Sequence, residues 1–218
     1  MARDGLTKRR LFGLDRSGPP PAPTRAGEPL QPWTIPNAIG YVRLALIPVF
    51  LAVALSSRDG RSAAAAVLFA VIGWADYLDG FAARLTGQYS RLGALLDPVI
   101  DRLLVISGMA VAFDFSLLPR WAIIVVLARE VCMLGLSRYA LRRGIDLKIN
   151  WPGRLGVAPT MGAPFFAMAG LHVVALVMLY VGMALTLLAT LLYVRRGAVE
   201  LKLAKSQAQI DPGSGARI

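Results

Sequence analysis

The chain has 218 residues, of which 56% are hydrophobic and 17% charged, and a formal net charge of +11. Its apolar residues fall in long runs separated by short polar connections, which excludes a disordered polypeptide and argues against a soluble domain. The single cysteine, Cys132, excludes an intramolecular disulfide and is expected to pack as a small apolar residue.

Residues 1–32 precede the first apolar run and differ from it in composition. They hold basic residues and a proline-rich stretch between Ser17 and Thr24, which cannot pack as a helix. No apolar stretch follows the basic residues promptly, so we do not expect a cleaved signal peptide. Residues 1–32 are therefore interpreted as a flexible N-terminal tail.

Six apolar runs follow, each of about the 20 residues that cross a bilayer as a helix. They cover residues 36–56, 63–84, 92–113, 121–141, 155–171 and 173–194. A buried core helix could explain one such run, but not six in succession. The sequence predicts an all-α integral membrane protein: six transmembrane helices in one domain, residues 33–196, and a C-terminal tail, residues 197–218.

Basic residues are concentrated on one side of the predicted membrane domain. On that side they are Lys8, Arg9, Arg10, Arg16, Arg25, Arg84, Arg91, Arg142, Arg143, Lys148, Arg154, Arg195, Arg196, Lys202 and Lys205. The opposite loops carry only Arg58, Arg61 and Arg120. This asymmetry predicts that both termini face the cytoplasm from the cell (inner or plasma) membrane. The positive charge is thus expected to set orientation and attract anionic lipid, with no nucleic-acid partner.

Four aspartates stand inside the second and third runs. Asp76 and Asp79 are three residues apart and Asp97 and Asp101 are four apart, so each pair shares a helix face. Both pairs are expected toward the cytoplasmic ends of two antiparallel helices. Each charge costs about 2.5–3.5 kcal/mol at the centre of a membrane helix, so cations must compensate them. Oxygen ligands without a nearby histidine or cysteine favour two Mg²⁺ or Mn²⁺ ions.

Two further residues of the second run lie close to these charges. Gly80 keeps the helix slim, which suits either a bulky ligand or helix packing. Arg84 lies about two helical turns from Asp76 on roughly the same face. It suits a diphosphate held between metal and guanidinium, or else an arginine that extends to the membrane interface.

The two segments together, DYLDGFAAR from Asp76 and GALLDPVID from Gly93, match the pattern D-x2-D-G-x2-A-R-x8-G-x3-D-x3-D at every fixed position. This pattern resembles the signature of the CDP-alcohol phosphatidyltransferases, and the six-span architecture is also similar to that family. The resemblance implies transfer of a phosphatidyl group from CDP-diacylglycerol to an alcohol, with release of CMP. It also implies two divalent ions, a cytoplasmic active site and a homodimer.

The resemblance also implies roles for individual residues. The metal ligands would be Asp76, Asp79, Asp97 and Asp101. Asp101 would in addition be the general base for the acceptor hydroxyl. The residues that contact CDP-diacylglycerol would be Asn37, Gly80, Arg84 and Ser90.

The remaining charges inside the apolar runs bear on the acceptor alcohol. They are Arg43 in the first run, Arg129, Glu130 and Arg138 in the fourth, and Arg154 at the start of the fifth. We expect Arg129, Arg138 and Arg154 to bind the acceptor, although anchoring at the cytoplasmic interface would also explain the last two. An ion pair between Arg129 and Glu130 is not expected, because adjacent residues diverge around a helix.

A basic pocket suits an acceptor that carries phosphate. Glycerol-3-phosphate, which would give phosphatidylglycerophosphate, is the acceptor we favour, and the stretch from Thr34 to Pro48 resembles that subfamily. Two departures are the loss of one basic residue between Gly153 and Val157 and a longer spacing from Arg129 to Arg138. The alternatives are cardiolipin synthesis from phosphatidylglycerol, phosphatidylinositol phosphate synthesis and, remotely, a small cation transporter.

Overall fold

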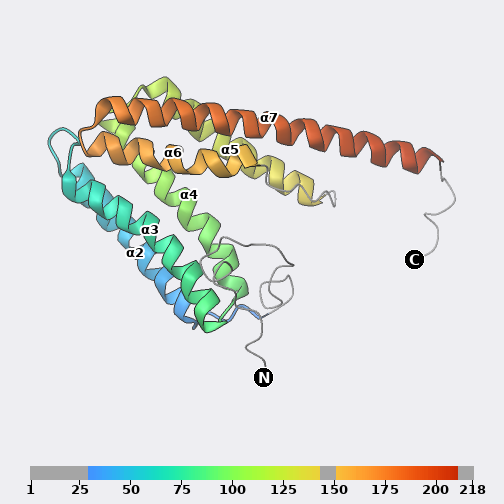
Figure 1. The fold of residues 1–218 in the computed structure, drawn as a ribbon, viewed down its shortest axis with the longest axis horizontal. Coiled ribbons are helices and arrows are strands. Elements are labelled where there is room, and N and C mark those ends of the chain that lie inside the picture. The colour runs from blue at the N-terminus through green and yellow to red at the C-terminus, as the bar shows by residue number, and fades with distance from the viewer. Residues whose placement is uncertain (1–28, 143–150, 211–218) are drawn as a thin grey trace. The chain divides into compact units, whose positions relative to one another are not determined.

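The computed structural model describes residues 29–142 and 151–210, with side chains for residues 29–136 and 155–195. The described residues form six helices and no strand. They are α2 (Ile35–Leu55), α3 (Ala63–Thr86), α4 (Arg91–Asp114), α5 (Arg120–Arg142), α6 (Trp151–Met168) and α7 (His172–Ile210). Each of the six expected runs coincides with one helix (Figure 1). Most of the N-terminal tail and the last eight residues lie outside the described part of the chain.

Polar residues and glycine define the ends of the first helices. Thr34, Ser62 and Ser90 cap the N-termini of α2, α3 and α4, and each side chain accepts a hydrogen bond from a backbone N–H three residues later. Gly87 ends α3 in the left-handed conformation, with φ +68°, which suits glycine because it has no Cβ. The short link from Gly87 to Ser90 therefore turns the chain back, so that α4 returns beside α3.

Three of the helices are long and apolar enough to cross a membrane. They are α2, α3 and the segment His172–Arg195 of α7, and Leu155–Met168 in α6 is a shorter apolar stretch. α4 and α5 also have the length of a span but carry more charged residues than these. α7 continues well past the expected end of the sixth run, as far as Ile210.

The chain divides into two compact units, each described here by itself. The first contains residues up to Leu117 together with Pro164–Leu171, and the second contains Leu118–Ala163 and the chain from His172 onward. In the first unit α2 packs against both α3 and α4, and α3 also contacts α4. Its apolar core includes Phe50 of α2 and Phe69 of α3, whose ring centroids are 5.4 Å apart.

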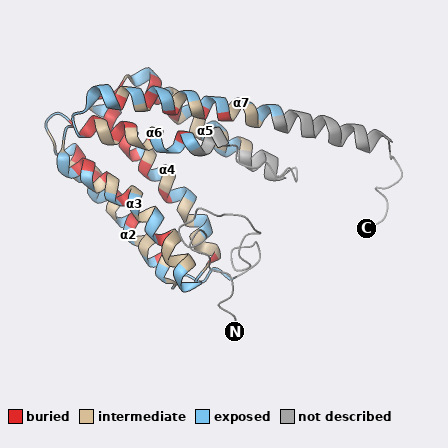
Figure 2. Cartoon of the chain, viewed as in Figure 1, coloured by how far each residue is buried: buried red, intermediate tan, exposed pale blue. Residues whose placement is uncertain are grey.

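The second unit is built from α5, α7 and the first part of α6. α5 packs against α7, and the rings of Trp121 and Tyr180 stack between them. Buried and exposed residues alternate around the helices of both units (Figure 2), as expected for helices whose outer faces meet lipid. Cys132 of α5 is exposed, so the expectation that it packs inside the chain is wrong.

Candidate functional site

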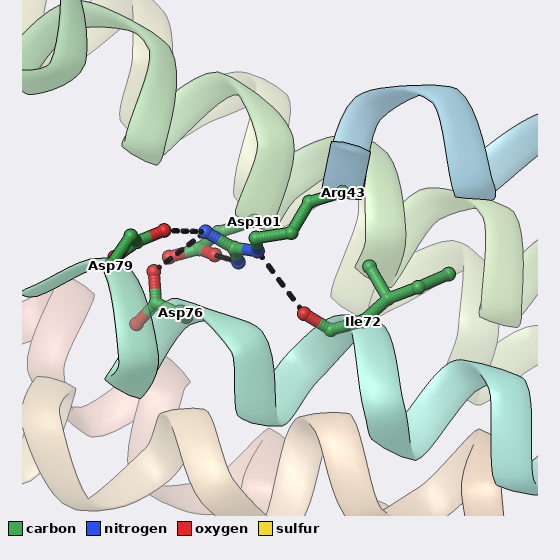
Figure 3. Close-up of polar contacts among 5 residues, drawn as sticks. All are labelled: Arg43, Ile72, Asp76, Asp79 and Asp101. Carbon is green, nitrogen blue, oxygen red and sulfur yellow. Dashed lines mark hydrogen bonds and ion pairs between the residues drawn. The ribbon is translucent and has the colours of Figure 1, made fainter. Parts of the chain in front are cut away.

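The polar end of the first unit lies where α2 begins, α3 ends and α4 begins. Asp76 and Asp79 project from the C-terminal half of α3, and Asp101 projects from the N-terminal half of α4. Figure 3 shows these three carboxylates gathered around the side chain of Arg43, which comes from α2. The structure therefore brings three of the four predicted metal ligands together.

Arg43 makes four hydrogen bonds, and its side chain is completely buried. Nη1 donates to Asp76 Oδ1 at 3.0 Å and to Asp79 Oδ2 at 2.9 Å. Nη2 donates to Asp101 Oδ1 at 2.8 Å, and Nε donates to the Ile72 carbonyl at 3.1 Å. A guanidinium can make these bonds at once because its N–H groups point in fixed, divergent directions. Arg43 thus joins α2, α3 and α4 through charged hydrogen bonds.

The three carboxylates differ in their exposure. The Asp79 side chain is 6% exposed, whereas those of Asp76 and Asp101 are 45% and 39% exposed. Arg43 bonds one oxygen of each carboxylate, so the second oxygen of each is not bonded to the guanidinium. The open side of the cluster is thus formed by Asp76 and Asp101. Asp97 lies one turn before Asp101 on α4 and is half-buried.

The chemistry of this donor set fits divalent ions. Four aspartates carry four negative charges when ionised, and the single charge of Arg43 leaves most of that charge uncompensated. Carboxylate oxygens are the ligands that Mg²⁺ and Mn²⁺ prefer. Among the described residues, however, no three acidic, histidine or cysteine side chains are arranged to hold one ion together. The carboxylates converge on the guanidinium instead.

Asn37 and Ser90, two predicted nucleotide contacts, are buried and bonded to each other. Ser90 Oγ donates to Asn37 Oδ1 at 2.8 Å, and Asn37 Nδ2 donates to the carbonyls of Gln31 and Pro32 at 2.9 and 3.2 Å. A Cβ on Gly93 would lie 2.7 Å from Asn37 Oδ1, so only glycine leaves room for this contact. Both residues therefore link the start of α2 to the start of α4.

Gly80 and Arg84 lie together on α3. A Cβ added to Gly80 would lie 3.3 Å from Arg84 Nη1, so the guanidinium covers the Cα of the glycine. Arg84 is also in the last turn of α3, where a positive charge is favoured by the helix dipole. Arg84 thus extends back toward Gly80, which directly follows Asp79, and the roles of both residues toward a nucleotide stay predictions.

Of the predicted acceptor residues, the structure describes only the side chain of Arg129. Its Nε donates to Thr190 Oγ1 of α7 at 2.9 Å, and its Nη1 donates to Glu130 Oε1. The expectation that Arg129 and Glu130 do not pair is therefore wrong, because both side chains are long enough to bend toward each other across adjacent positions. The side chains of Arg138 and Arg154 lie outside the described residues.

Arg43 is the site residue whose place among the aspartates the sequence did not reveal. It was grouped with the charges that bear on the acceptor, whereas its partners are Asp76, Asp79 and Asp101. The signal that points to it is its isolation, because Arg43 is the only charged residue of α2. A lone charge inside an apolar helix calls for a partner of opposite charge on a neighbouring helix.

Comparison with known proteins agrees with this geometry. A family model described as CDP-alcohol phosphatidyltransferase matches residues 33–192. A protein of Streptomyces coelicolor named cardiolipin synthase (CMP-forming) is 38% identical over 125 residues, which cover 56% of this chain and 58% of that protein. A protein of Bacillus subtilis named CDP-diacylglycerol–glycerol-3-phosphate 3-phosphatidyltransferase is 32% identical over 135 residues, covering 56% of this chain and 70% of that protein.

A longer match is made by a Mycobacterium tuberculosis protein named "Probable phosphatidylglycerophosphate synthase". It is 31% identical over 167 residues, covering 73% of this chain and 79% of that protein. Mycobacterial relatives at 37% identity are matched over only 57% of their length. The family model, in contrast, extends from before α2 into α7 and includes all four aspartates. The chain belongs to the CDP-alcohol phosphatidyltransferase family.

Proposed function

We propose that this protein is a membrane enzyme of phospholipid biosynthesis that transfers a phosphatidyl group from CDP-diacylglycerol to glycerol-3-phosphate. The products are phosphatidylglycerophosphate and CMP. The observation that carries the proposal is the convergence of Asp76, Asp79 and Asp101 at one end of α3 and α4, in a chain that the family model matches over residues 33–192. The helix α3, which bears Asp76 and Asp79, is long and apolar enough to cross a membrane, where the lipid donor resides.

The reaction requires an acceptor oxygen to attack the phosphorus on the diacylglycerol side of the diphosphate. A new O–P bond forms, the bond from that phosphorus to the bridging oxygen breaks, and CMP leaves. Two divalent ions, when bound by Asp76, Asp79, Asp97 and Asp101, supply charge neutralisation for the diphosphate and the leaving group. The chain itself has to orient both substrates and remove the proton of the acceptor hydroxyl.

Asp101 is our candidate for the group that takes this proton. One of its oxygens accepts a hydrogen bond from Arg43, and the side chain is 39% exposed, so an acceptor can approach the carboxylate. Arg84, beside Gly80, is our candidate for a donor-phosphate contact, because a guanidinium suits phosphate oxygens. Asn37 and Ser90 are proposed to shape the nucleotide end of the site through the hydrogen bonds that hold α2 against α4.

The orientation and surroundings are further parts of the proposal. The basic residues favour cytoplasmic termini and a cytoplasmic active site, in the cell membrane, where a soluble acceptor can reach Asp101. Arg129, Arg138 and Arg154 are proposed to bind the acceptor phosphate, and the protein is proposed to act as a homodimer. Relatives named for glycerol-3-phosphate transfer and phosphatidylglycerophosphate synthesis support this acceptor.

A second candidate is cardiolipin synthesis, in which phosphatidylglycerol is the acceptor. The observation that favours it is the 38% identity to the Streptomyces coelicolor cardiolipin synthase, higher than the identity to the relatives named for glycerol-3-phosphate. The loss of a basic residue between Gly153 and Val157 agrees with an acceptor that itself lies in the membrane. The donor and the chemistry at the aspartates are the same in both candidates.

The test is to incubate the purified full-length protein with CDP-diacylglycerol, Mg²⁺ or Mn²⁺, and one acceptor at a time. The acceptors are glycerol-3-phosphate, phosphatidylglycerol and inositol phosphate, and the readouts are CMP release and the mass of the lipid product. We expect phosphatidylglycerophosphate from the first acceptor. A cardiolipin product from the second alone would select the other candidate, and no CMP with any acceptor would refute the enzyme assignment.

A further inference from the structure

Arg43 contacts three carboxylates, whereas a simple ion pair joins an arginine to one. Its side chain is 0% exposed, and it donates charged hydrogen bonds to Asp76, Asp79 and Asp101 on two other helices. A buried arginine without such partners would be strongly destabilising, and so would buried carboxylates without a cation. The arginine and the carboxylates therefore depend on each other wherever no other cation is present.

The same contacts place the positive charge of Arg43 beside the carboxylates that a divalent ion would otherwise neutralise. One oxygen each of Asp76, Asp79 and Asp101 is directed at the guanidinium, and no three metal-binding side chains of the described residues are arranged to hold one ion together. An ion that binds these aspartates must either share them with Arg43 or displace its hydrogen bonds. In both cases two positive charges lie close together in a poorly solvated place, where their repulsion is weakly screened.

We propose that Arg43 is the resident counter-cation of the carboxylate cluster and that it competes with divalent ions for Asp76, Asp79 and Asp101. The proposal rests on the proposed function only in taking these aspartates to be metal ligands. Arg43 is a positioning residue in this scheme. It holds the ends of α2, α3 and α4 together in the metal-free protein, and it sets how high the divalent-ion concentration must be before the ions bind.

A competitor has a distinctive thermodynamic signature. Removing Arg43 leaves the carboxylates uncompensated, so the metal-free protein loses stability, whereas bound ions restore much of that charge balance. Removal should also strengthen ion binding, because the cluster becomes more negative. A residue with a merely structural role would lower the stability of both forms by the same amount and leave the ion affinity unchanged.

The experiment measures thermal unfolding of the full-length protein in detergent micelles, with EDTA and across a titration of Mn²⁺ or Mg²⁺. The main variant is Arg43→Gln, which removes the charge. Arg43→Lys keeps one charge but cannot bridge three carboxylates, and it serves as the second variant if the first does not fold. The matched control is Ile47→Ala, one turn along the same face of α2, where a buried apolar side chain is shortened.

We expect the difference in Tm between saturating Mn²⁺ and EDTA to widen by roughly 5 °C or more in Arg43→Gln. The Mn²⁺ concentration for half-maximal stabilisation should fall by about 5-fold or more, the lower end of typical coupling between sites. Arg43→Lys should show a smaller widening, and Ile47→Ala should lower both Tm values equally. Equal losses in EDTA and Mn²⁺ for the Arg43 variants, or weaker ion binding, would overturn the proposal.

These measurements need no substrate, so they separate this proposal from the proposed function. A widened Tm difference in a protein that releases no CMP would support the role of Arg43 and refute the enzyme assignment. CMP release by the wild type, with no change of ion affinity in the Arg43 variants, would support the enzyme assignment and refute the role of Arg43.

Discussion

At the scale of single residues, Asp101 is both held by a hydrogen bond and partly exposed. One of its oxygens accepts a hydrogen bond from Arg43 at 2.8 Å, which fixes the orientation of the carboxylate, and the side chain is 39% exposed. A carboxylate that is held by a hydrogen bond and is partly exposed is suited to accept a proton from a substrate hydroxyl.

We expect Asp101→Asn to lower kcat by about 10²–10⁴-fold, the usual contribution of a general base, while CDP-diacylglycerol binding is largely kept. The amide has nearly the shape of the carboxylate but cannot take the proton. CMP release measures the first effect, and binding of a CDP-diacylglycerol analogue measures the second. Asp114→Asn, exposed at the far end of α4, is the control and should be as active as the wild type. Full activity in Asp101→Asn would contradict the role.

Gly80→Ala tests the contact between Gly80 and Arg84. The new Cβ would lie 3.3 Å from Arg84 Nη1, so the guanidinium has to move by a few tenths of an ångström. We expect the KM for CDP-diacylglycerol to rise by less than about tenfold. Gly73→Ala is the matched control on the same helix, because its Cβ would meet Leu104 at an ordinary 3.7 Å. Equal effects of the two substitutions on KM would show that Arg84 does not contact the donor.

Much of the carboxylate arrangement could be predicted from spacing, since residues three or four apart on a helix must share a face. That argument predicted that Asp76 and Asp79 share a face of α3, and both contact Arg43 in the structure. Spacing within one helix does not show which residues of different helices contact each other, so it did not predict the partners of Arg43. It also failed for Arg129 and Glu130, because spacing describes the Cβ directions and not the reach of long side chains.

At the scale of elements, α6 and α7 approach each other through small residues. A Cβ on Gly182 would lie 2.7 Å from Thr160 Oγ1 and 2.8 Å from the Thr160 backbone nitrogen. Thr160 is buried, and its hydroxyl donates to the Gly156 carbonyl one turn earlier, so no polar group is left unsatisfied at the contact. Close packing of this kind is how apolar helices associate within lipid.

We expect Gly182→Ala to destabilise the protein by about 1–3 kcal/mol, because the backbone of Thr160 cannot yield to the new methyl group. This corresponds to a fall in Tm of roughly 2–12 °C in detergent. Gly135→Ala on α5 is the control, because a Cβ there meets nothing within 4 Å and its Tm should not fall. A Tm for Gly182→Ala equal to that of the wild type would mean that α6 and α7 can separate without cost.

The approximate bounds of the helices could be predicted from the runs of apolar residues, and in the structure Ser90 caps α4 and Gly87 ends α3. The extent of α7 could not be judged in the same way. Its last residues are too polar to mark a membrane span, yet the backbone stays helical to Ile210. Hydropathy reports where a helix can meet lipid and not where its hydrogen bonding stops.

At the scale of the whole molecule, the sequence predicted a helical membrane protein of this family because charge, hydropathy and motif agreed. Three of the helices meet the length and apolarity that a span requires, and the more charged α4 and α5 show why the remaining spans are harder to read. In a membrane protein, the charged residues of a site lower the mean hydropathy of their helix, and hydropathy is the property by which a span is recognised. Hydropathy therefore identifies membrane spans most clearly in the helices that carry the fewest charged site residues.

The hydrogen bonds of Arg43 also bear on how the chain enters the membrane during synthesis. α2 is made first and carries one charge, whereas α3 carries Asp76 and Asp79, each costing up to about 2.5–3.5 kcal/mol if it enters lipid unpaired. We expect α3 to insert efficiently only when α2 precedes it, and less efficiently after α2 with Arg43→Gln. Glycosylation of reporter sites at the translocon measures this, and equal insertion of α3 with or without α2 would contradict it. Arg43 would then act twice: in the finished protein it holds the carboxylates of the site, and during synthesis it helps α3 to insert into the membrane.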